Sequence, residues 1–226
     1  MVPGPGGNWF IALVVPDGGR LLAATEGLPQ ALRRLPPQDL HITLAFLGAC
    51  GEARATAAWQ AIAALVHPPL LVRPSAWRAM GPSRRPSALA LTLDQGHDVA
   101  AALIEAWRLP ALAGAALACD ARPALPHITV LRPPRRPRGG PAAAAFTPDL
   151  LAGMEHAPVP DTTLLLQEIA LYCWAEPRTT RHWFAIARRR RLDQPEGGGQ
   201  PSSGHPAWPR MAPELLGASP EASPPE

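Results

Sequence analysis

The chain has 226 residues, of which 47% are hydrophobic, and this composition excludes a wholly disordered protein. Its 30 prolines and 19 glycines predict long irregular segments between the regular elements. The 21 basic residues are all arginines, and 18 acidic residues reduce the formal net charge to +3, which by itself identifies no partner.

Hydrophobic periodicity and turn residues predict strands and helices in a mixed order. In the first half we expect a strand over Trp9–Val15, a helix over Leu21–Leu35, a strand over Leu40–Leu47, a helix over Glu52–Val66 and a strand pair over Leu70–Met80 and Ala88–Leu93. Further along the chain we expect a helix over Asp94–Leu109 ended by Pro110, a strand over Pro126–Leu131, a loop over Arg132–Pro160 and closing strands over Leu164–Trp174 and His182–Arg188. Because the elements do not alternate strictly, an α+β fold with mainly antiparallel sheets is favoured over a doubly wound parallel sheet.

The charge is divided unevenly along the chain. The last 34 residues, from Asp193 to Glu226, hold five acidic residues and one arginine, so the part before them has a net charge of +7. A basic body suggests an anionic substrate or partner, although solvated arginines without a partner would give the same count. We expect residues 1–192 to form one domain and residues 193–226, rich in Pro, Gly and Ser, to form a disordered acidic tail.

Cysteine usage and the N-terminal segment bear on the compartment. Cys50, Cys119 and Cys173 are odd in number, widely spaced and match no metal-binding pattern, which predicts unpaired thiols in a reducing compartment. The apolar run over Trp9–Val15 is too short for a secretory or membrane-spanning segment. We therefore expect a soluble cytoplasmic monomer without membrane contact, and the Arg-, Ala- and Pro-rich composition suggests a bacterial source.

One short motif occurs twice. His41–Leu44 reads His-Ile-Thr-Leu and His127–Val130 reads His-Ile-Thr-Val, 86 residues apart, each on a predicted strand. Since residues two apart in a strand share a face, each motif presents one imidazole and one hydroxyl side by side. Two such strands facing each other would bring two histidines and two hydroxyl donors to a single site.

This set of groups suits the hydrolysis of a phosphodiester. Histidine, with an ordinary pKa near 6.5, serves as general base for water or as general acid for the leaving oxygen. The hydroxyls of Thr43 and Thr129 can donate to phosphate oxygens, and Arg132, five residues after His127, can add a bidentate phosphate contact or stack on a base. The residues alone do not say which histidine is the acid, because the two motifs are identical.

Other interpretations account for parts of this pattern. A single histidine on a half-buried strand is more often structural than catalytic, but the repetition argues against that interpretation. Two histidines can bind a metal, yet no Asp, Glu or Cys accompanies either one at ligand spacing, so we expect no metal. An RNA-binding module that uses the basic body without catalysis remains an alternative from another class.

The segments His41–Gly48 and Pro126–Arg132 resemble the two signature motifs of the 2H phosphoesterase superfamily. The resemblance is strongest to the bacterial RNA 2′,3′-cyclic phosphodiesterases, also described as 2′-5′ RNA ligases. It extends to Trp9–Ala12 and to the closing strands between Ile169 and Ala187. It implies a bilobal, LigT-like α+β fold in which two pseudo-symmetric lobes surround a central cleft.

The resemblance also implies an activity. It is the hydrolysis of 2′,3′-cyclic phosphate ends of RNA or oligonucleotides to 2′-phosphomonoesters, without metal or cofactor. His41 would be the proton donor and His127 the proton acceptor, while Thr43 and Thr129 would hold the phosphate. A 2′-5′ RNA ligase or a small cyclic-nucleotide phosphodiesterase on the same site would be alternatives.

Two further sets of residues are candidates for substrate binding. Phe10 either borders the base pocket or fills the core, the second being the commoner role for a buried aromatic residue. Arg132, Arg135, Arg136 and Arg138 follow the second histidine directly, where a phosphate-bearing chain would enter.

Overall fold

The computed structural model describes residues 2–3, 6–83, 85–134, 146–176 and 182–196. The strands are β1 (Val2–Pro3), β2 (Trp9–Val14), β3 (Arg33–Arg34), β4 (His41–Gly48), β5 (Leu70–Val72), β6 (Pro74–Met80), β7 (Ala88–Leu93), β8 (His127–Arg132), β9 (Leu164–Leu166), β10 (Glu168–Glu176) and β11 (Phe184–Arg191). The helices are α1 (Gly18–Ala23), α2 (Glu52–Ala61), α3 (His97–Gly114) and α4 (Pro148–Glu155), with a 3₁₀ turn η1 at Pro37–Asp39. The described strands pair antiparallel throughout, which confirms the predicted α+β class.

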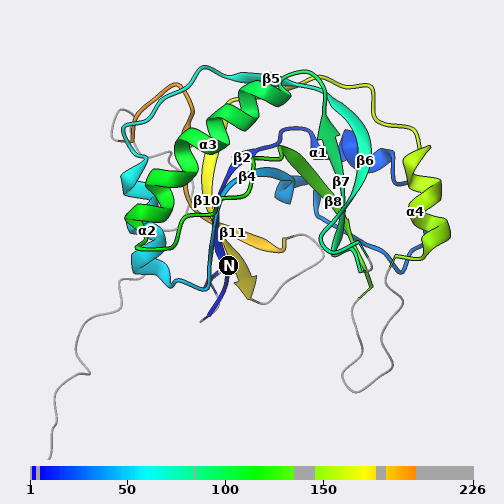
Figure 1. The fold of residues 1–226 in the computed structure, drawn as a ribbon, viewed down its shortest axis with the longest axis horizontal. Coiled ribbons are helices and arrows are strands. Elements are labelled where there is room, and N and C mark those ends of the chain that lie inside the picture. The colour runs from blue at the N-terminus through cyan, green and yellow to red at the C-terminus, as the bar shows by residue number, and fades with distance from the viewer. Residues whose placement is uncertain (1, 4–5, 84, 135–145, 177–181, 197–226) are drawn as a thin grey trace, which may run out of the picture.

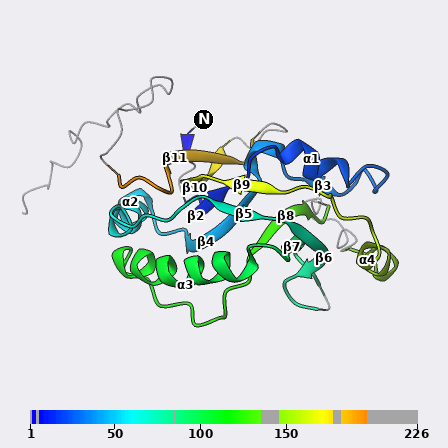
Figure 2. The same ribbon diagram turned by 90° about the horizontal axis from the view of Figure 1, so that it is seen from above.

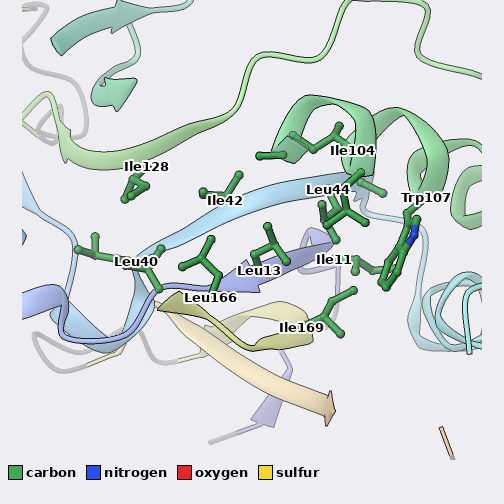
Figure 3. Close-up of a cluster of buried hydrophobic side chains, with 14 of the residues drawn as sticks. Ile11, Leu13, Leu40, Ile42, Leu44, Ile104, Trp107, Ile128, Leu166 and Ile169 are labelled. Carbon is green, nitrogen blue, oxygen red and sulfur yellow. The ribbon is translucent and has the colours of Figure 1, made fainter. Parts of the chain in front are cut away.

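The first lobe is built on the sheet β1-β10-β2-β4, to which β11 adds by pairing with β10. Helix α3 runs along β4 and α2 packs on α3, so one face of this sheet is covered by helices (Figure 1). Figure 3 shows Ile42 and Leu44 of β4 on the side of Ile104 and Trp107 of α3. The opposite face of the sheet is therefore the one on which His41 and Thr43 lie.

The second lobe is the sheet β3-β8-β7-β6, and its strand β6 contacts α4 (Figure 2). The indole Nε1 of Trp77 donates a hydrogen bond of 3.2 Å to the carbonyl of Pro158, just after α4. The lobes meet where β4 contacts β8, and Ile42 and Ile128 belong to one continuous core. The two repeated motifs thus lie on neighbouring strands at the junction of the lobes.

Each motif strand carries a β-bulge at the same position. In β4, Thr43 and Ala45 pair with two successive residues of β2, so Leu44 between them is an extra residue without a partner in the ladder. In β8, Val130 is an extra residue against β7 in the same way. A bulge shifts the side-chain alternation by one residue. Phe46 and Arg132, each five residues after a histidine, therefore return to the face of that histidine instead of pointing into the core.

The predicted helix over Leu21–Leu35 is wrong. Helix α1 ends at Ala23, and β3 at Arg33–Arg34 pairs with β8. Gly27 has a φ of +82°, a left-handed conformation that ends helical geometry. The Arg34 guanidinium donates to the carbonyls of the α1–β3 loop, so that residue is held outside a helix.

Two other boundaries differ from the prediction. Helix α3 continues through Pro110 to Gly114, because the following turn buries Ala111 and Leu112 in the core, and this packing outweighs the lost backbone hydrogen bond. Within the predicted loop Arg132–Pro160, residues 148–155 form α4. Thr147 caps it by accepting from the Leu150 amide, an N-cap signal followed by proline that the prediction passed over.

Remaining differences are at element ends. Helix α2 stops at Ala61, five residues before the predicted end at Val66, and the predicted strand over Leu70–Met80 is divided into β5, which pairs with β9, and β6, which pairs with β7. The other predicted strands fall within a few residues of the observed ones.

Only the first four residues of the predicted tail are described. The carbonyl of Gln194 accepts from the Arg190 guanidinium at 2.7 Å, and the Glu196 amide donates to the carbonyl of Ala63 at 2.9 Å. The chain thus still contacts the body up to residue 196, and residues 197–226 lie outside the described residues. The three cysteines are unpaired, and no helix among the described residues is long and apolar enough to cross a membrane.

Candidate active site

The two motif histidines are held in the same way. His41 begins β4 and His127 begins β8. The Nδ1 of His41 donates to the carbonyl of Asp39 at 2.6 Å, and the Nδ1 of His127 donates to the carbonyl of Leu125 at 2.7 Å, in each case two residues earlier. A carbonyl only accepts, so Nδ1 carries the hydrogen in both rings. Each Nε2 is therefore the nitrogen left for proton transfer.

Burial and nearby positive charges lower the pKa of both histidines. Burial, with smaller contributions from the positive charges of Arg132 and His127, lowers the pKa of His41 to about 4, while the hydrogen bond to the Asp39 carbonyl opposes this shift. The pKa of His127 is lowered by burial as well, and next by Arg132 and Arg78. Both imidazoles are thus neutral at pH 7 in the free protein. Because β4 contacts β8, and His127 and Arg132 both contribute to the lowered pKa of His41, we treat His41, Thr43, His127, Thr129 and Arg132 as one site, called here the two-histidine site.

Both motif threonines are free to bind a ligand. Thr43 is half-buried and Thr129 is 8% exposed, each two residues after its histidine on the same face. Neither hydroxyl has a hydrogen-bond partner within the described part of the chain. A phosphate oxygen could accept from both.

An aromatic cluster formed by Phe10, Tyr172 and Phe184 packs against the ring of His41. The ring centroid of Phe10 is 4.7 Å from that of His41, and Tyr172 stacks on Phe10 at 5.0 Å. Phe184 meets the His41 ring edge-on at 5.4 Å. Phe10, a candidate either to border the base pocket or to fill the core, is only 3% exposed, and its ring packs against the imidazole of His41. Tyr172 and Phe184 were missed, because only the pairing of β10 with β2 and β11 brings them here.

Beside the second motif lie arginines. Arg132 donates from Nη1 to the carbonyl of Ser87 at 3.2 Å. Arg33, which lies in the segment predicted as a helix and was not a predicted site residue, pairs with Arg132 across β3 and β8, and its guanidinium lies 5.1 Å from the Trp183 ring centroid. The predicted Arg135, Arg136 and Arg138 fall outside the described residues.

Phe46 was also missed. It pairs with Phe10 in the β2–β4 ladder, so it lies on the face of His41, and it is 56% exposed. Strict alternation along the strand places Phe46 on the face opposite His41, and only the bulge at Leu44 brings it back to the histidine face, so no local sequence signal identified it. It offers an aromatic surface next to the two-histidine site.

Asp39 connects the first motif to β11. Asp39 is 2% exposed, and its carboxylate accepts from the Trp183 amide and lies 3.8 Å from Nδ1 of His182. Burial raises the pKa of Asp39, while the amides of Trp183 and Phe184 lower it in part. Since the same residue's carbonyl holds His41, Asp39 fixes the start of β4 against the start of β11.

Among the described residues, no group of three or more His, Cys, Asp or Glu side chains is placed to hold a metal ion.

Comparison with known proteins bears on the fold. Neither a protein-family model nor a curated protein sequence matches the chain. Solved structures do match: a phosphoesterase is 24% identical with a TM-score of 0.59, the match covering 83% of this chain and 99% of the other. TT0787 of Thermus thermophilus is 18% identical with a TM-score of 0.58, the match covering 82% and 98%. The chain has the fold of the 2H phosphoesterases, as its motifs predicted.

The same comparison finds LigT of E. coli. Its apo structure is 23% identical with a TM-score of 0.59, and the match covers 84% of this chain and all of LigT. LigT has also been solved with NADP+, with 3′-AMP and with ATP. At this identity the similarity shows a LigT-like fold, and the chemistry has to be argued from the site.

Proposed function

We propose that the protein hydrolyses 2′,3′-cyclic phosphate ends of RNA or oligonucleotides to 2′-phosphomonoesters. The observation that supports this most is the pair of His-Ile-Thr strands. Each has the same Nδ1-to-carbonyl bond, and the two join at the junction of the lobes. General acid–base catalysis of this hydrolysis needs one group that accepts a proton and one that donates a proton, and the two Nε2 atoms can fill these roles.

In the proposed reaction water attacks the phosphorus atom as the bond to the 3′-oxygen breaks. Nε2 of one histidine takes a proton from the water, and Nε2 of the other gives a proton to the departing 3′-oxygen. The products are a 2′-phosphomonoester and a free 3′-hydroxyl, and the protein is left with the same number of protons. By resemblance to the 2H phosphoesterases we assign the acid to His41 and the base to His127. Thr43, Thr129 and Arg132 would stabilise the negative charge on the phosphate oxygens.

The pKa values place one requirement on this reaction. In the free protein both histidines are neutral at pH 7, because burial and nearby arginines lower both pKa values. A bound phosphate brings negative charge, which raises the pKa of both imidazoles and opposes the effect of Arg132. The acid would therefore gain its proton as the substrate binds.

A nucleotide substrate fits the surroundings of the site. Phe46 presents a half-exposed ring on the face of His41, and base–aromatic stacking contributes about 1–3 kcal/mol per base. Arg132 and Arg33 supply positive charge on the second lobe. LigT structures with 3′-AMP, ATP and NADP+ support a nucleotide ligand for this fold.

The test is hydrolysis of a nucleoside 2′,3′-cyclic phosphate in EDTA. We expect activity that is lost by a factor of about 10²–10⁴ in His41→Ala and in His127→Ala, with circular dichroism unchanged. A profile of kcat/KM against pH should be bell-shaped with its optimum below pH 6.5, since both pKa values are lowered. Full activity in either variant contradicts the proposal.

Other outcomes identify the alternatives. Joining of RNA halves that carry a 2′,3′-cyclic phosphate, without net hydrolysis, would indicate a 2′-5′ ligase. RNA binding that falls with salt and survives the loss of both histidines, without turnover of any cyclic phosphate, would indicate a binding module.

A further inference from the structure

A third arginine faces the two-histidine site from β6. In the second sheet Arg78 pairs with Ala90 of β7, and Ala90 pairs with Thr129 of β8. Residues directly opposite each other in neighbouring strands lie on one face of the sheet. The adjacent row, Trp77–Leu91–Ile128, is buried in the core, so the row with Arg78 is the one that faces the site.

The side chains of this row leave room between Arg78 and the phosphate position. Two strand spacings separate Arg78 from Thr129, roughly 10 Å between backbones. The strand between them contributes only the methyl group of Ala90. The long side chain of Arg78 can cross part of this distance, and its charge lowers the pKa of His127.

Arg78 also has no other structural role among the described residues. It is exposed and forms no hydrogen bond or ion pair within that part of the chain. Arg73, five residues earlier, is held by the carboxylate of Asp94 at 2.7 Å. Arg132 donates to a carbonyl of the loop that precedes β7. Arg78 is thus a cation at the edge of the site whose donors are free for a ligand.

We propose that Arg78 binds the phosphodiester that precedes the cyclic phosphate in an oligonucleotide chain. The inference rests on the proposed function and makes it more specific: the site would recognise at least two nucleotides, and a cyclic mononucleotide would leave Arg78 unused. The guanidinium of Arg78 lies two β-strands away from Thr129, so it suits a phosphate group at some distance from the reacting one, such as the next phosphate in the nucleotide chain. Arginine binds phosphate oxygens in a bidentate manner.

The test compares a dinucleotide ending in a 2′,3′-cyclic phosphate with the cyclic mononucleotide of the same terminal base. Arg78→Ala should raise KM for the dinucleotide about ten-fold and leave KM for the mononucleotide unchanged, with kcat similar for both. Arg78→Lys should give an intermediate KM, because it keeps the charge without the fork of donors. Any shift in the pKa of His127 affects both substrates, so the ratio of their kcat/KM values removes it.

A neutral linkage makes the test independent of general charge effects. A dinucleotide with a methylphosphonate in place of the internal phosphodiester should bind the wild type as weakly as the normal dinucleotide binds Arg78→Ala. The variant should not distinguish the two dinucleotides. Arg73→Ala removes the same charge from a residue already paired with Asp94, and it should leave the dinucleotide preference intact.

Several results would overturn the inference: an equal rise in KM for both substrates, no rise for either, or the same loss in Arg73→Ala. If the wild type hydrolyses neither substrate, the proposed function fails, and binding decides on Arg78 separately. Calorimetry with the dinucleotide 2′-phosphomonoester and its methylphosphonate analogue should then show a preference for the charged linkage that Arg78→Ala abolishes. Equal affinities would show that Arg78 binds no internal phosphate.

Discussion

The two lobes present the same tripeptide in opposite surroundings. Both histidines donate from Nδ1 to the carbonyl two residues earlier, and both strands bulge at the fourth residue of the motif. His41, however, lies against the rings of Phe10, Tyr172 and Phe184, whereas His127 lies among the charges of arginines. The repeat therefore sets the geometry of proton transfer, and the neighbours of each strand make the two imidazoles chemically different.

That difference matters for the division of labour. The base must be neutral and the acid protonated, and burial disfavours the protonated form of an imidazole. His41 is the more deeply buried ring and has a pKa of about 4, so burial makes it the harder of the two to protonate in the free protein. The resemblance to 2H phosphoesterases assigns the acid to this same residue. The bound phosphate would have to supply the missing stabilisation, and this can be tested directly.

The largest effect is expected from the leaving group. A cyclic substrate with sulfur in place of the departing 3′-oxygen needs no general acid, because a thiolate is a good leaving group. His41→Ala should recover at least about 10²-fold of its lost rate with this substrate, and His127→Ala should recover none. Rate constants are measured for both variants with both substrates. Recovery in His127→Ala alone would exchange the two roles.

The pH dependence of stability should also separate the lobes. The pKa of His41 is about 4 in the folded protein and near 6.5 in the unfolded chain, which therefore binds more protons between these values. The neutral ring contributes its full stability above pH 6.5 and loses roughly 3 kcal/mol as the pH falls through 4.

Urea unfolding at pH 7 and at pH 4.5 checks this expectation for His41→Gln and, as the matched control, for His127→Gln. His41→Gln should remove more of the acid sensitivity, because His41 is the more deeply buried ring. An equal or larger effect of His127→Gln would mean that burial against the aromatic cluster does not set the difference.

A smaller effect is expected from Asp39, which has no counterpart in the second lobe, where Leu125 occupies the equivalent position. Asp39→Ala leaves the partly buried amide of Trp183 without this acceptor and should lower the free energy of unfolding by about 1–3 kcal/mol. Asp39→Asn keeps an acceptor oxygen and should retain most of that stability. Thermal unfolding of the two variants measures the difference, and equal losses would show that the bond to β11 contributes little.

The smallest effect is expected from Tyr172. Its hydroxyl is buried without a hydrogen-bond partner among the described residues, and burial raises its pKa. Tyr172→Phe removes the unsatisfied group while keeping the ring that stacks on Phe10. The free energy of unfolding should stay equal or rise by up to about 1 kcal/mol, with turnover unchanged. A loss of turnover would assign the hydroxyl a role at the site.

Sequence patterns could predict the parts of the site that depend on local periodicity. The alternation of apolar and polar residues placed His41 with Thr43, and His127 with Thr129, on shared faces. The same alternation would have turned Arg132 into the core, since it lies an odd number of residues after His127. The bulge at Val130 reverses this, and a bulge depends on the partner strand, which single-strand periodicity does not contain.

Contacts between distant segments were beyond local patterns for the same reason. Tyr172 and Phe184 reach His41 only through the register of β10 with β2 and β11. Arg33 fell within a segment predicted as helix, and its pairing with β8 depends on a turn at Gly27. Antiparallel sheets and the repeated motif were predictable, whereas the surroundings that distinguish the lobes required the tertiary structure.

The paired Nδ1 bonds have one more consequence, for the cycle as a whole. With one nitrogen of each ring fixed, a turnover of the proposed reaction removes a proton from one Nε2 and adds a proton to the other. The protein thus releases its product in a protonation isomer that cannot start the next round. It must exchange protons with water or buffer first, and the ring buried among aromatic side chains has the poorer access to solvent. At high substrate concentration, this resetting step would compete with the chemistry for control of the rate.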